Sequence, residues 1–229
     1  MEPEAYTEAL QLHFATHANP YNAGRMRSYM LNQFDYYGIP APLRKQLAGE
    51  FIALHGLPAP ELLAETVRIA WQLPQRELQY VMMEICSRKQ FMSGENRIAL
   101  YIYMITTKSW WDTVDFIAAN LVGPWLARHA DHTMPVVDEF MQSGNMWLQR
   151  TALLFQLKYK NATDFLLLAG FIEQLAESKE FFIRKAIGWA LREYSKTNPE
   201  KVVEFVSGHT ISPLSRKEAL RIILKHKEQ

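Results

Sequence analysis

A hydrophobic periodicity of three and four residues runs through almost the whole chain and constrains its fold more than any other feature. Residues at these spacings lie on one face of an α-helix, so the pattern predicts amphipathic helices. Three examples are Leu43, Leu47, Phe51 and Leu54; Leu78, Val81, Met82 and Ile85; and Phe182, Ala186 and Trp189. The two-residue alternation typical of half-buried strands is missing over any useful length. The sequence therefore predicts an all-α protein.

Proline and glycine divide this pattern into segments. Six prolines stand where a helix is expected to begin, which is the position that proline tolerates best: Pro20, Pro42, Pro60, Pro124, Pro199 and Pro213. Single glycines stand where helices end or connect. The spacing predicts on the order of a dozen helices of about 10 to 16 residues with short connections. Because no linker-like segment interrupts the chain, we expect one domain over residues 1–229.

An internal repeat would explain the spacing of charged residues near predicted helix starts. A step of about 35 residues from Lys45 reaches Tyr80, Asp115, Arg150 and Lys185, and a slightly shorter step reaches Lys217. This period is typical of an α-α superhelix of stacked HEAT-like helix pairs, in which equivalent positions form a column on one face. The column would be mostly basic, with Asp115 as its one acid. Two alternatives stay open: the register is accidental, or these charges bond only to neighbouring turns.

The charge balance does not indicate a polyanion partner. The chain has 25 Lys and Arg against 24 Asp and Glu, so a nucleic-acid surface depends on where the charges lie. A basic face with exposed aromatic rings would suit DNA, because cations displace counterions from phosphate and rings stack on sugar or base.

Compartment signals are few. The chain has a single cysteine, Cys86, in an apolar stretch, which favours a buried small side chain in a reducing compartment. The first residues lack the basic and apolar regions of a signal peptide. The most apolar run, residues 165–172, is too short to span a bilayer. We expect a soluble cytoplasmic protein, associated with the nucleoid if it is bacterial, with no membrane partner.

Residues 108–115, KSWWDTVD, carry the strongest chemical signal. Trp111 and Asp115 are four residues apart, so on a helix an aromatic face and a carboxylate project from the same side. Asp112 lies off that side, and a structural duty in the first helical turn suits it better. A structural interpretation of the whole motif also stands, because paired tryptophans are often core residues and an Asp near a helix start is often a cap.

Metal and cofactor motifs are weak or missing. His13 and His17 have a spacing that metals use, but no third ligand is evident nearby. His129 and His132 flank Asp131 in a predicted loop and are better explained as polar surface. The sequence has no Gly-rich phosphate loop, dinucleotide fingerprint or nucleophile elbow. We expect no metal ion and no organic cofactor.

Several long motifs in order resemble the DNA alkylation repair glycosylases of the AlkD-like family. They are KSWWDTVD at 108–115, NMWLQR at 145–150, FQLKYK at 155–160 and SKEFFIRKAIGWALREY at 178–194. The similarity extends from residues 27–30 to residues 213–219. At residues 71–77 the framework persists, but glutamines stand where acids are expected, which puts the local surface charge in doubt.

The resemblance implies a monomeric HEAT-like solenoid that binds duplex DNA and removes purines alkylated at N3 or N7. By position, Asp115 matches the catalytic carboxylate, Trp111 and Trp189 match active-site tryptophans, Arg150 matches a DNA-contacting arginine and Tyr29 a DNA-facing tyrosine. The repeat register adds Lys45 and Lys185 as expected DNA contacts. The rival hypothesis is a noncatalytic HEAT-like module that binds DNA or a protein.

The implied chemistry needs few groups. Alkylation at N3 or N7 makes the purine cationic, so the base leaves as a neutral molecule without a strong general acid. One carboxylate can stabilise the developing positive charge on deoxyribose and orient the attacking water. Indole faces favour a cationic base by about 0.5 to 2 kcal/mol. Since a helical stack suggests no deep pocket, we expect limited extrusion of the damaged nucleotide.

Overall fold

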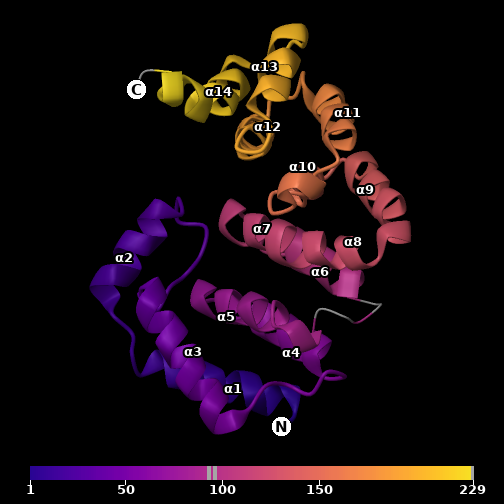
Figure 1. Ribbon diagram of the computed structural model, residues 1–229. Coiled ribbons are helices and arrows are strands. Elements are labelled where there is room, and N and C mark those ends of the chain that lie inside the picture. The colour runs from indigo at the N-terminus through magenta and orange to yellow at the C-terminus, as the bar shows by residue number, and fades with distance from the viewer. Residues whose placement is uncertain (92–93, 95–96, 228–229) are drawn as a thin grey trace. The chain divides into compact units, whose positions relative to one another are not determined.

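The computed structural model describes residues 1–91, 94 and 97–227 (Figure 1). Regular structure within them is helical, apart from an isolated β-bridge between Asp35 and Gln75. The predicted all-α fold class is therefore confirmed. None of the helices in these ranges is both long enough and apolar enough to cross a membrane.

Backbone contacts divide the chain into two compact units, Met1–Gly94 and Glu95–Gln229. The first contains α1 (Pro3–Ala15), α2 (Pro20–Tyr29), α3 (Ala41–His55), α4 (Leu63–Gln72), α5 (Arg76–Cys86) and the 3₁₀ turn η1 (Lys89–Phe91). The second contains α6 (Arg97–Thr106), α7 (Trp111–Ile117), the π-helical η2 (Ala118–Val122), α8 (Gly123–Arg128), η3 (Ala130–His132), α9 (Thr133–Gln142), α10 (Met146–Leu154), η4 (Lys160–Ala162), α11 (Phe165–Leu175), α12 (Phe181–Tyr194), α13 (Pro199–Gly208) and α14 (Pro213–Lys227). The single domain over residues 1–229 stays a prediction.

The first unit packs α1 against α3 and α4, and both α3 and α4 against α5. Its core includes Tyr6, Phe51, Trp71 and the fully buried Cys86, whose burial was predicted. Glu77 of α5 holds the segment before α3 against this core, because its carboxylate accepts hydrogen bonds from the backbone N–H groups of residues 37–39 at 2.9–3.1 Å. The helix α2 takes little part in the core, since Ala23 is its one buried residue.

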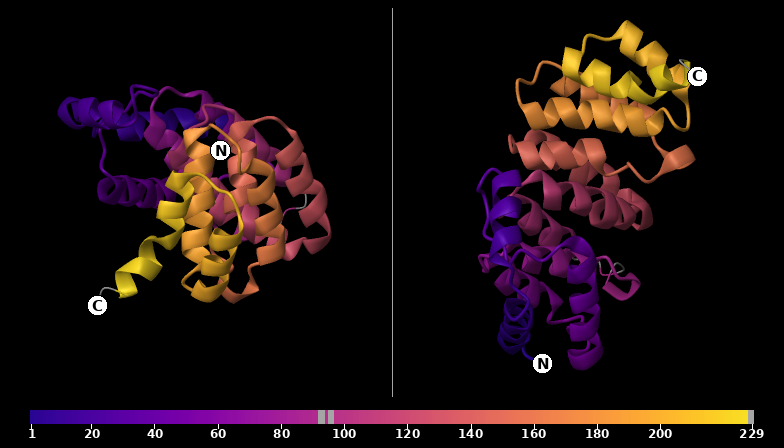
Figure 2. Two further views of the ribbon diagram at one scale, coloured as in Figure 1. Left: turned by 90° about the horizontal axis from the view of Figure 1, so that it is seen from above. Right: turned by 90° about the vertical axis from the view of Figure 1, so that its left-hand side faces the viewer.

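The second unit contains a row of neighbouring helices, α7, α10, α12 and α14, here called the inner row. Helix α7 packs against α10, α10 against α12, and α12 against α14. Figure 2 shows α10 to α14 as successive layers of the second unit. Helices α9, α11 and α13 connect the members of the row in sequence and pack against them.

The predicted step of about 35 residues relates neighbouring members of the inner row. Arg150 of α10 contacts Asp115 of α7, 35 positions away in sequence. Lys185 of α12 contacts Glu218 of α14, 33 positions away, whereas the predicted member Lys217 is exposed. One residue along a helix turns the side chain by about 100°, so this one-residue error selects a different face. The row therefore carries two acids, Asp115 and Glu218, at its ends and two bases, Arg150 and Lys185, between them. The predicted mostly basic column, with Asp115 as its one acid, is corrected here.

Most of the six prolines stand at or near the start of a helix, as predicted. Pro20, Pro199 and Pro213 begin their helices, and Pro42 is the second residue of α3. Pro60 precedes α4 by three positions, and Pro124 lies inside a continuous helical segment from α7 to α8. Proline within a helix lacks an N–H donor and crowds the preceding turn, and the π-helical turn immediately before it gives the ring space. Pro124 is the second residue of α8, as Pro42 is of α3, but the helical backbone continues into α8 from η2.

Gly188 allows α14 to approach α12 closely. A Cβ atom at this position would lie 2.5 Å from the Cβ of Glu218 and 2.8 Å from the carbonyl oxygen of Ser215. Both atoms belong to α14, and one of them is backbone. This packing holds Glu218 against the face of α12 that carries Lys185.

We expect Gly188→Ala to lower the free energy of unfolding by about 1 to 3 kcal/mol, because the added methyl group overpacks this contact. Gly170→Ala in α11 is the matched control, since its Cβ would have no neighbour within 4 Å. That control should raise stability by about 0.5 to 1 kcal/mol through helix propensity. Urea denaturation of the two variants measures both values, and equal effects would contradict the packing argument.

Candidate active site

A pocket of about 340 Å³ lies within the second unit and opens to solvent. Helices α7, α10, α12 and α14 of the inner row all contribute to its wall. The lining residues are Trp111, Asp115, Arg150, Phe181, Phe182, Lys185, Trp189, Arg192 and Glu218. Five residues that the sequence analysis selected, Trp111, Asp115, Arg150, Lys185 and Trp189, thus meet around one pocket.

Helix α7 places Trp111 and Asp115 one turn apart on this wall. Trp110 caps the helix with an extended backbone conformation, so α7 begins at Trp111. The side-chain oxygen of Thr113 donates a hydrogen bond to the Trp110 carbonyl, which secures the first turn. Asp112 lies in that first turn, as expected, and does not line the pocket.

Helix α12 presents one face to the pocket. Phe182, Lys185, Trp189 and Arg192 follow one another at spacings of three, four and three residues, so they share a side of the helix. The opposite side of α12 is buried against the rest of the unit through residues such as Ile183, Ile187 and Leu191. The apolar periodicity of this segment therefore also determines which of its polar residues reach the pocket.

Asp115 and Arg150 form the central interaction of the site. The carboxylate accepts hydrogen bonds from Nε of Arg150 at 2.7 Å and from Nη2 at 2.8 Å. Nη1 of Arg150 donates to the carbonyl oxygen of Phe182, which links α12 to the pair. The Asp115 side chain is 13% exposed and that of Arg150 is 5% exposed. Such a two-pronged contact fixes the plane of the carboxylate.

The surroundings of Asp115 act on its pKa in opposite directions. Burial raises the pKa above its ordinary value, the hydrogen bonds and charge of Arg150 lower it, and the charge of Asp112 raises it. The net pKa is raised. Desolvation therefore outweighs the effect of Arg150 on this pKa.

An aromatic cluster of Trp110, Trp147 and Phe182 lies beside the pair. The ring centroids are 5.2 Å apart for Trp110 and Phe182, 5.0 Å for Trp147 and Phe182, and 5.9 Å for the two tryptophans. Each ring stands at or near the first residue of α7, α10 or α12. The cluster therefore packs the beginnings of three inner-row helices together and positions the Phe182 carbonyl that Arg150 contacts.

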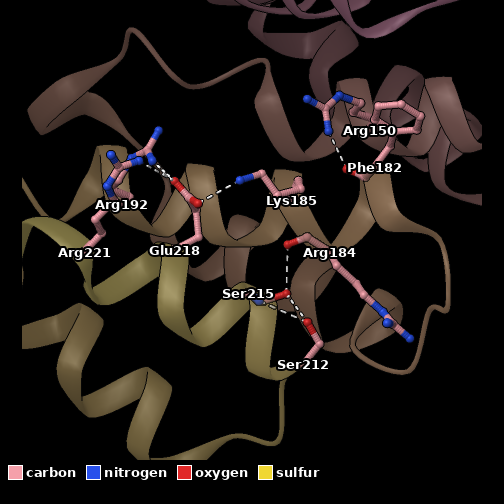
Figure 3. A network of polar contacts seen from close by, with 9 residues as sticks. All are labelled: Arg150, Phe182, Arg184, Lys185, Arg192, Ser212, Ser215, Glu218 and Arg221. Atoms are coloured by element: carbon pink, nitrogen blue, oxygen red, sulfur yellow. Dashed lines mark hydrogen bonds and ion pairs between the residues drawn. The ribbon is translucent and has the colours of Figure 1, made fainter. Parts of the chain in front are cut away.

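Glu218 of α14 forms ion pairs with cationic side chains at the pocket (Figure 3). Its Oε2 atom lies 2.8 Å from Nζ of Lys185, and its Oε1 atom pairs with Nη1 of Arg192. Arg221, on the next turn of α14, approaches Oε1 at 3.7 Å. Burial and the charges of Arg192, Arg221 and Arg150 lower the pKa of Lys185. The Glu218 carboxylate opposes that shift, because an adjacent opposite charge favours the ammonium form.

Arg192, Glu218 and Phe182 line the pocket but were not predicted from the sequence as site residues. Arg192 could have been found from its spacing to Lys185 and Trp189, and Glu218 is adjacent in sequence to Lys217. Tyr29 and Lys45 belong to the first unit, where Tyr29 is 72% exposed and Lys45 is also exposed. Their contacts with DNA, and that of Arg150, stay predictions.

Metal ligands do not gather in the part of the chain that the structure describes, where no group of three or more His, Cys, Asp or Glu could hold an ion. The His13 ring nitrogen Nε2 lies 3.1 Å from the carbonyl oxygen of Leu47, and Nδ1 of His17 lies 3.1 Å from that of His13. His129 stacks on Trp125 with ring centroids 4.4 Å apart. These histidines have structural partners.

Comparison with known proteins supports the same relationship. No curated protein matches the chain. One solved structure that is similar is described as a predicted DNA alkylation repair enzyme from Enterococcus faecalis. It is 37% identical, with a TM-score of 0.81, and the match covers 89% of this chain and 95% of that one. The family model described as DNA alkylation repair enzyme matches residues 10–223. The chain therefore belongs to the DNA alkylation repair enzyme family.

Proposed function

We propose that this protein is a DNA glycosylase that hydrolyses the N-glycosidic bond of purines alkylated at N3 or N7 in duplex DNA. The observation that carries the proposal is the Asp115 carboxylate, which is held by Arg150 and faces a pocket lined by Trp111 and Trp189. Membership of the family makes DNA the expected substrate. The kind of lesion and the bond broken belong to the proposal.

Asp115 would act on the sugar of the damaged nucleotide. As the bond to the cationic base stretches, positive charge develops on deoxyribose, and an adjacent carboxylate stabilises that charge. The base leaves as a neutral molecule, water adds to C1′, and the proton of that water passes through the carboxylate or directly to solvent. Each carboxylate oxygen keeps a lone pair beyond the one that Arg150 uses, so the pair with Arg150 leaves Asp115 able to perform both tasks.

Trp111 and Trp189 would select the cationic lesion. Both lie half-buried on the pocket wall, where their faces can contact a charged base or polarised C–H groups of the sugar. A neutral purine gains less from this contact, which gives a preference for alkylated bases. The pocket opens to solvent, so we keep the hypothesis that the nucleotide is handled with limited extrusion. A complex with the base rotated fully into an enclosed cavity would contradict it.

Asp115→Asn tests the proposal directly. We expect at least about a 10²-fold loss of single-turnover excision from methylated duplex DNA, as for removal of a catalytic acid or base, with DNA binding retained. Asp112→Asn is the matched control, because it removes the same charge from the same helix without lining the pocket. Chromatography of the released bases measures the rate. Release by the unaltered protein but equally by Asp115→Asn would overturn the role of Asp115, and no release by either would favour the noncatalytic binding module.

The pH profile of excision should follow the ionisation of Asp115. Excision needs the carboxylate, so the rate is lost as the pH falls through the pKa of this group. Because burial raises that pKa, the midpoint of the acid limb is expected above 3.8, the ordinary value. In Arg150→Gln the hydrogen bonds and the charge that lower the pKa are gone, so the midpoint should move to still higher pH.

Arg184→Gln is the control for this shift. It removes the same charge from the inner row, but Arg184 contacts the Ser178 carbonyl and does not line the pocket. Rates corrected for spontaneous base loss at each pH give the three profiles. An unmoved acid limb in Arg150→Gln, or an equal shift in Arg184→Gln, would count against the pairing argument.

Lys185→Ala should weaken binding to duplex DNA of any sequence. If Lys185 contacts one phosphate, the slope of log K against log salt concentration should fall in magnitude by about 0.9. Lys196→Ala is the control, since Lys196 lies two residues beyond the end of the same helix, is paired with Glu193 and does not line this pocket. Fluorescence anisotropy over a salt series measures both slopes, and identical slopes for Lys185→Ala and the unaltered protein would remove Lys185 from the DNA interface.

A further inference from the structure

Glu218 is the one acid on a wall of the pocket that is otherwise cationic. Its two carboxylate oxygens serve different partners, Oε2 for Lys185 and Oε1 for Arg192. The side chain is 11% exposed, whereas that of Lys185 is 37% exposed and reaches solvent in the pocket. Glu218 is therefore the more deeply buried partner of the contact that joins the two side chains (Figure 3).

We propose that Glu218 is a positioning residue that holds Lys185 and Arg192 at the separation needed to bind a DNA phosphate beside the damaged nucleotide. This inference rests on the proposed function. It assigns no contact between Glu218 and the substrate. It assigns to α14, the last helix of the chain, a part in the chemistry that α7 and α12 carry out.

Glu218 provides the counter-charge for a group of crowded cations. Lys185, Arg192 and Arg221 crowd one region, and Arg150 adds a further positive charge nearby. Like charges at such distances repel, and the long side chains of lysine and arginine would separate into solvent without a counter-charge. The buried carboxylate of Glu218 satisfies two of these cations at once and keeps them on the pocket wall.

Contacts between α12 and α14 fix the position of Glu218 itself. Its Cβ lies against Gly188, where no larger residue fits without displacing α14. Ser215, one turn earlier in α14, donates a hydrogen bond from its hydroxyl to the Arg184 carbonyl at 2.8 Å. A second contact of this hydroxyl, with that of Ser212, secures the beginning of the helix. A carboxylate held this firmly can fix the positions of its partners.

The charged residues of the pocket form two groups, one around Asp115 and one around Glu218. Asp115, held by Arg150, gives one wall a negative charge, and Lys185 and Arg192, held by Glu218, give the other wall positive charges. An alkylated nucleotide carries positive charge on the base, which passes to the sugar in the transition state, and negative charge on the phosphate. The two walls match that distribution, so the spacing of the cations matters for bringing C1′ to Asp115.

Glu218→Gln tests the inference, because glutamine keeps the size of the side chain and removes its charge. We expect single-turnover excision to fall roughly 10-fold or more, since misplacement of the phosphate moves the sugar from Asp115. Binding to undamaged duplex should be unchanged or tighter, because a negative charge has been removed near the DNA. Glu218→Asp, which restores the charge, should recover part of the rate.

Glu193→Gln is the matched control. It changes the net charge equally and lies beside Arg192 in sequence, but it lines a different pocket and pairs with Lys196. Its excision rate should equal that of the unaltered protein. A Glu218→Gln rate within twofold of this control overturns the inference. A joint loss of excision rate, DNA affinity and thermal stability in Glu218→Gln also overturns the inference, because a purely structural residue would give that result.

The remaining outcomes are also decisive. If the unaltered protein binds duplex DNA but releases no base, the proposed function fails, and the role of Glu218 in excision fails with it. If the unaltered protein does not bind duplex DNA, both proposals fail. If Glu218→Gln does not fold, Lys185→Gln breaks the same contact from its exposed side, and an undiminished excision rate in that variant overturns the inference.

Discussion

The two-pronged contact between Asp115 and Arg150 is the interaction on which the site depends. It joins α7 to α10, and through the Phe182 carbonyl it also joins α12, so three helices of the inner row meet at one guanidinium group. Removing either partner would leave a largely buried charge without its counter-charge, which is costly inside a protein. The same contact orients the carboxylate toward the pocket. These two residues therefore contribute to stability and, in the proposed reaction, also to the chemistry.

Close packing between helices makes this arrangement possible. The aromatic cluster of Trp110, Trp147 and Phe182 packs the starts of α7, α10 and α12 together, and Gly188 lets α14 approach α12. The aromatic cluster and Gly188 both lie at the edge of the pocket. The residues that hold the helices in register are thus neighbours of those that line the site, and a shift of any inner-row helix would change the distance between the two charged walls.

On each wall of the pocket, a charged group is held by a partner of the opposite charge, and the sign of the group differs between the two walls. A carboxylate on one side is held by an arginine, and a lysine and an arginine on the other side are held by a carboxylate. In each case the group that faces the pocket is oriented by a more deeply buried partner of opposite charge. Such preorganised charges stabilise a charged transition state without having to reorganise during the reaction. This is consistent with a chain whose net charge is +1, because the position of each charge matters more than the total.

By itself, the sequence determined the all-α fold class, the repeat step that relates Asp115 to Arg150, and the helical face shared by Trp111 and Asp115, because all three depend on spacing along a helix. Only the tertiary structure decided which oppositely charged partner each residue has. A repeat step places residues to within about one position, and one position turns a side chain by about 100°. Sequence spacing therefore selected the exposed Lys217, and helix packing placed the buried Glu218 in the inner row instead.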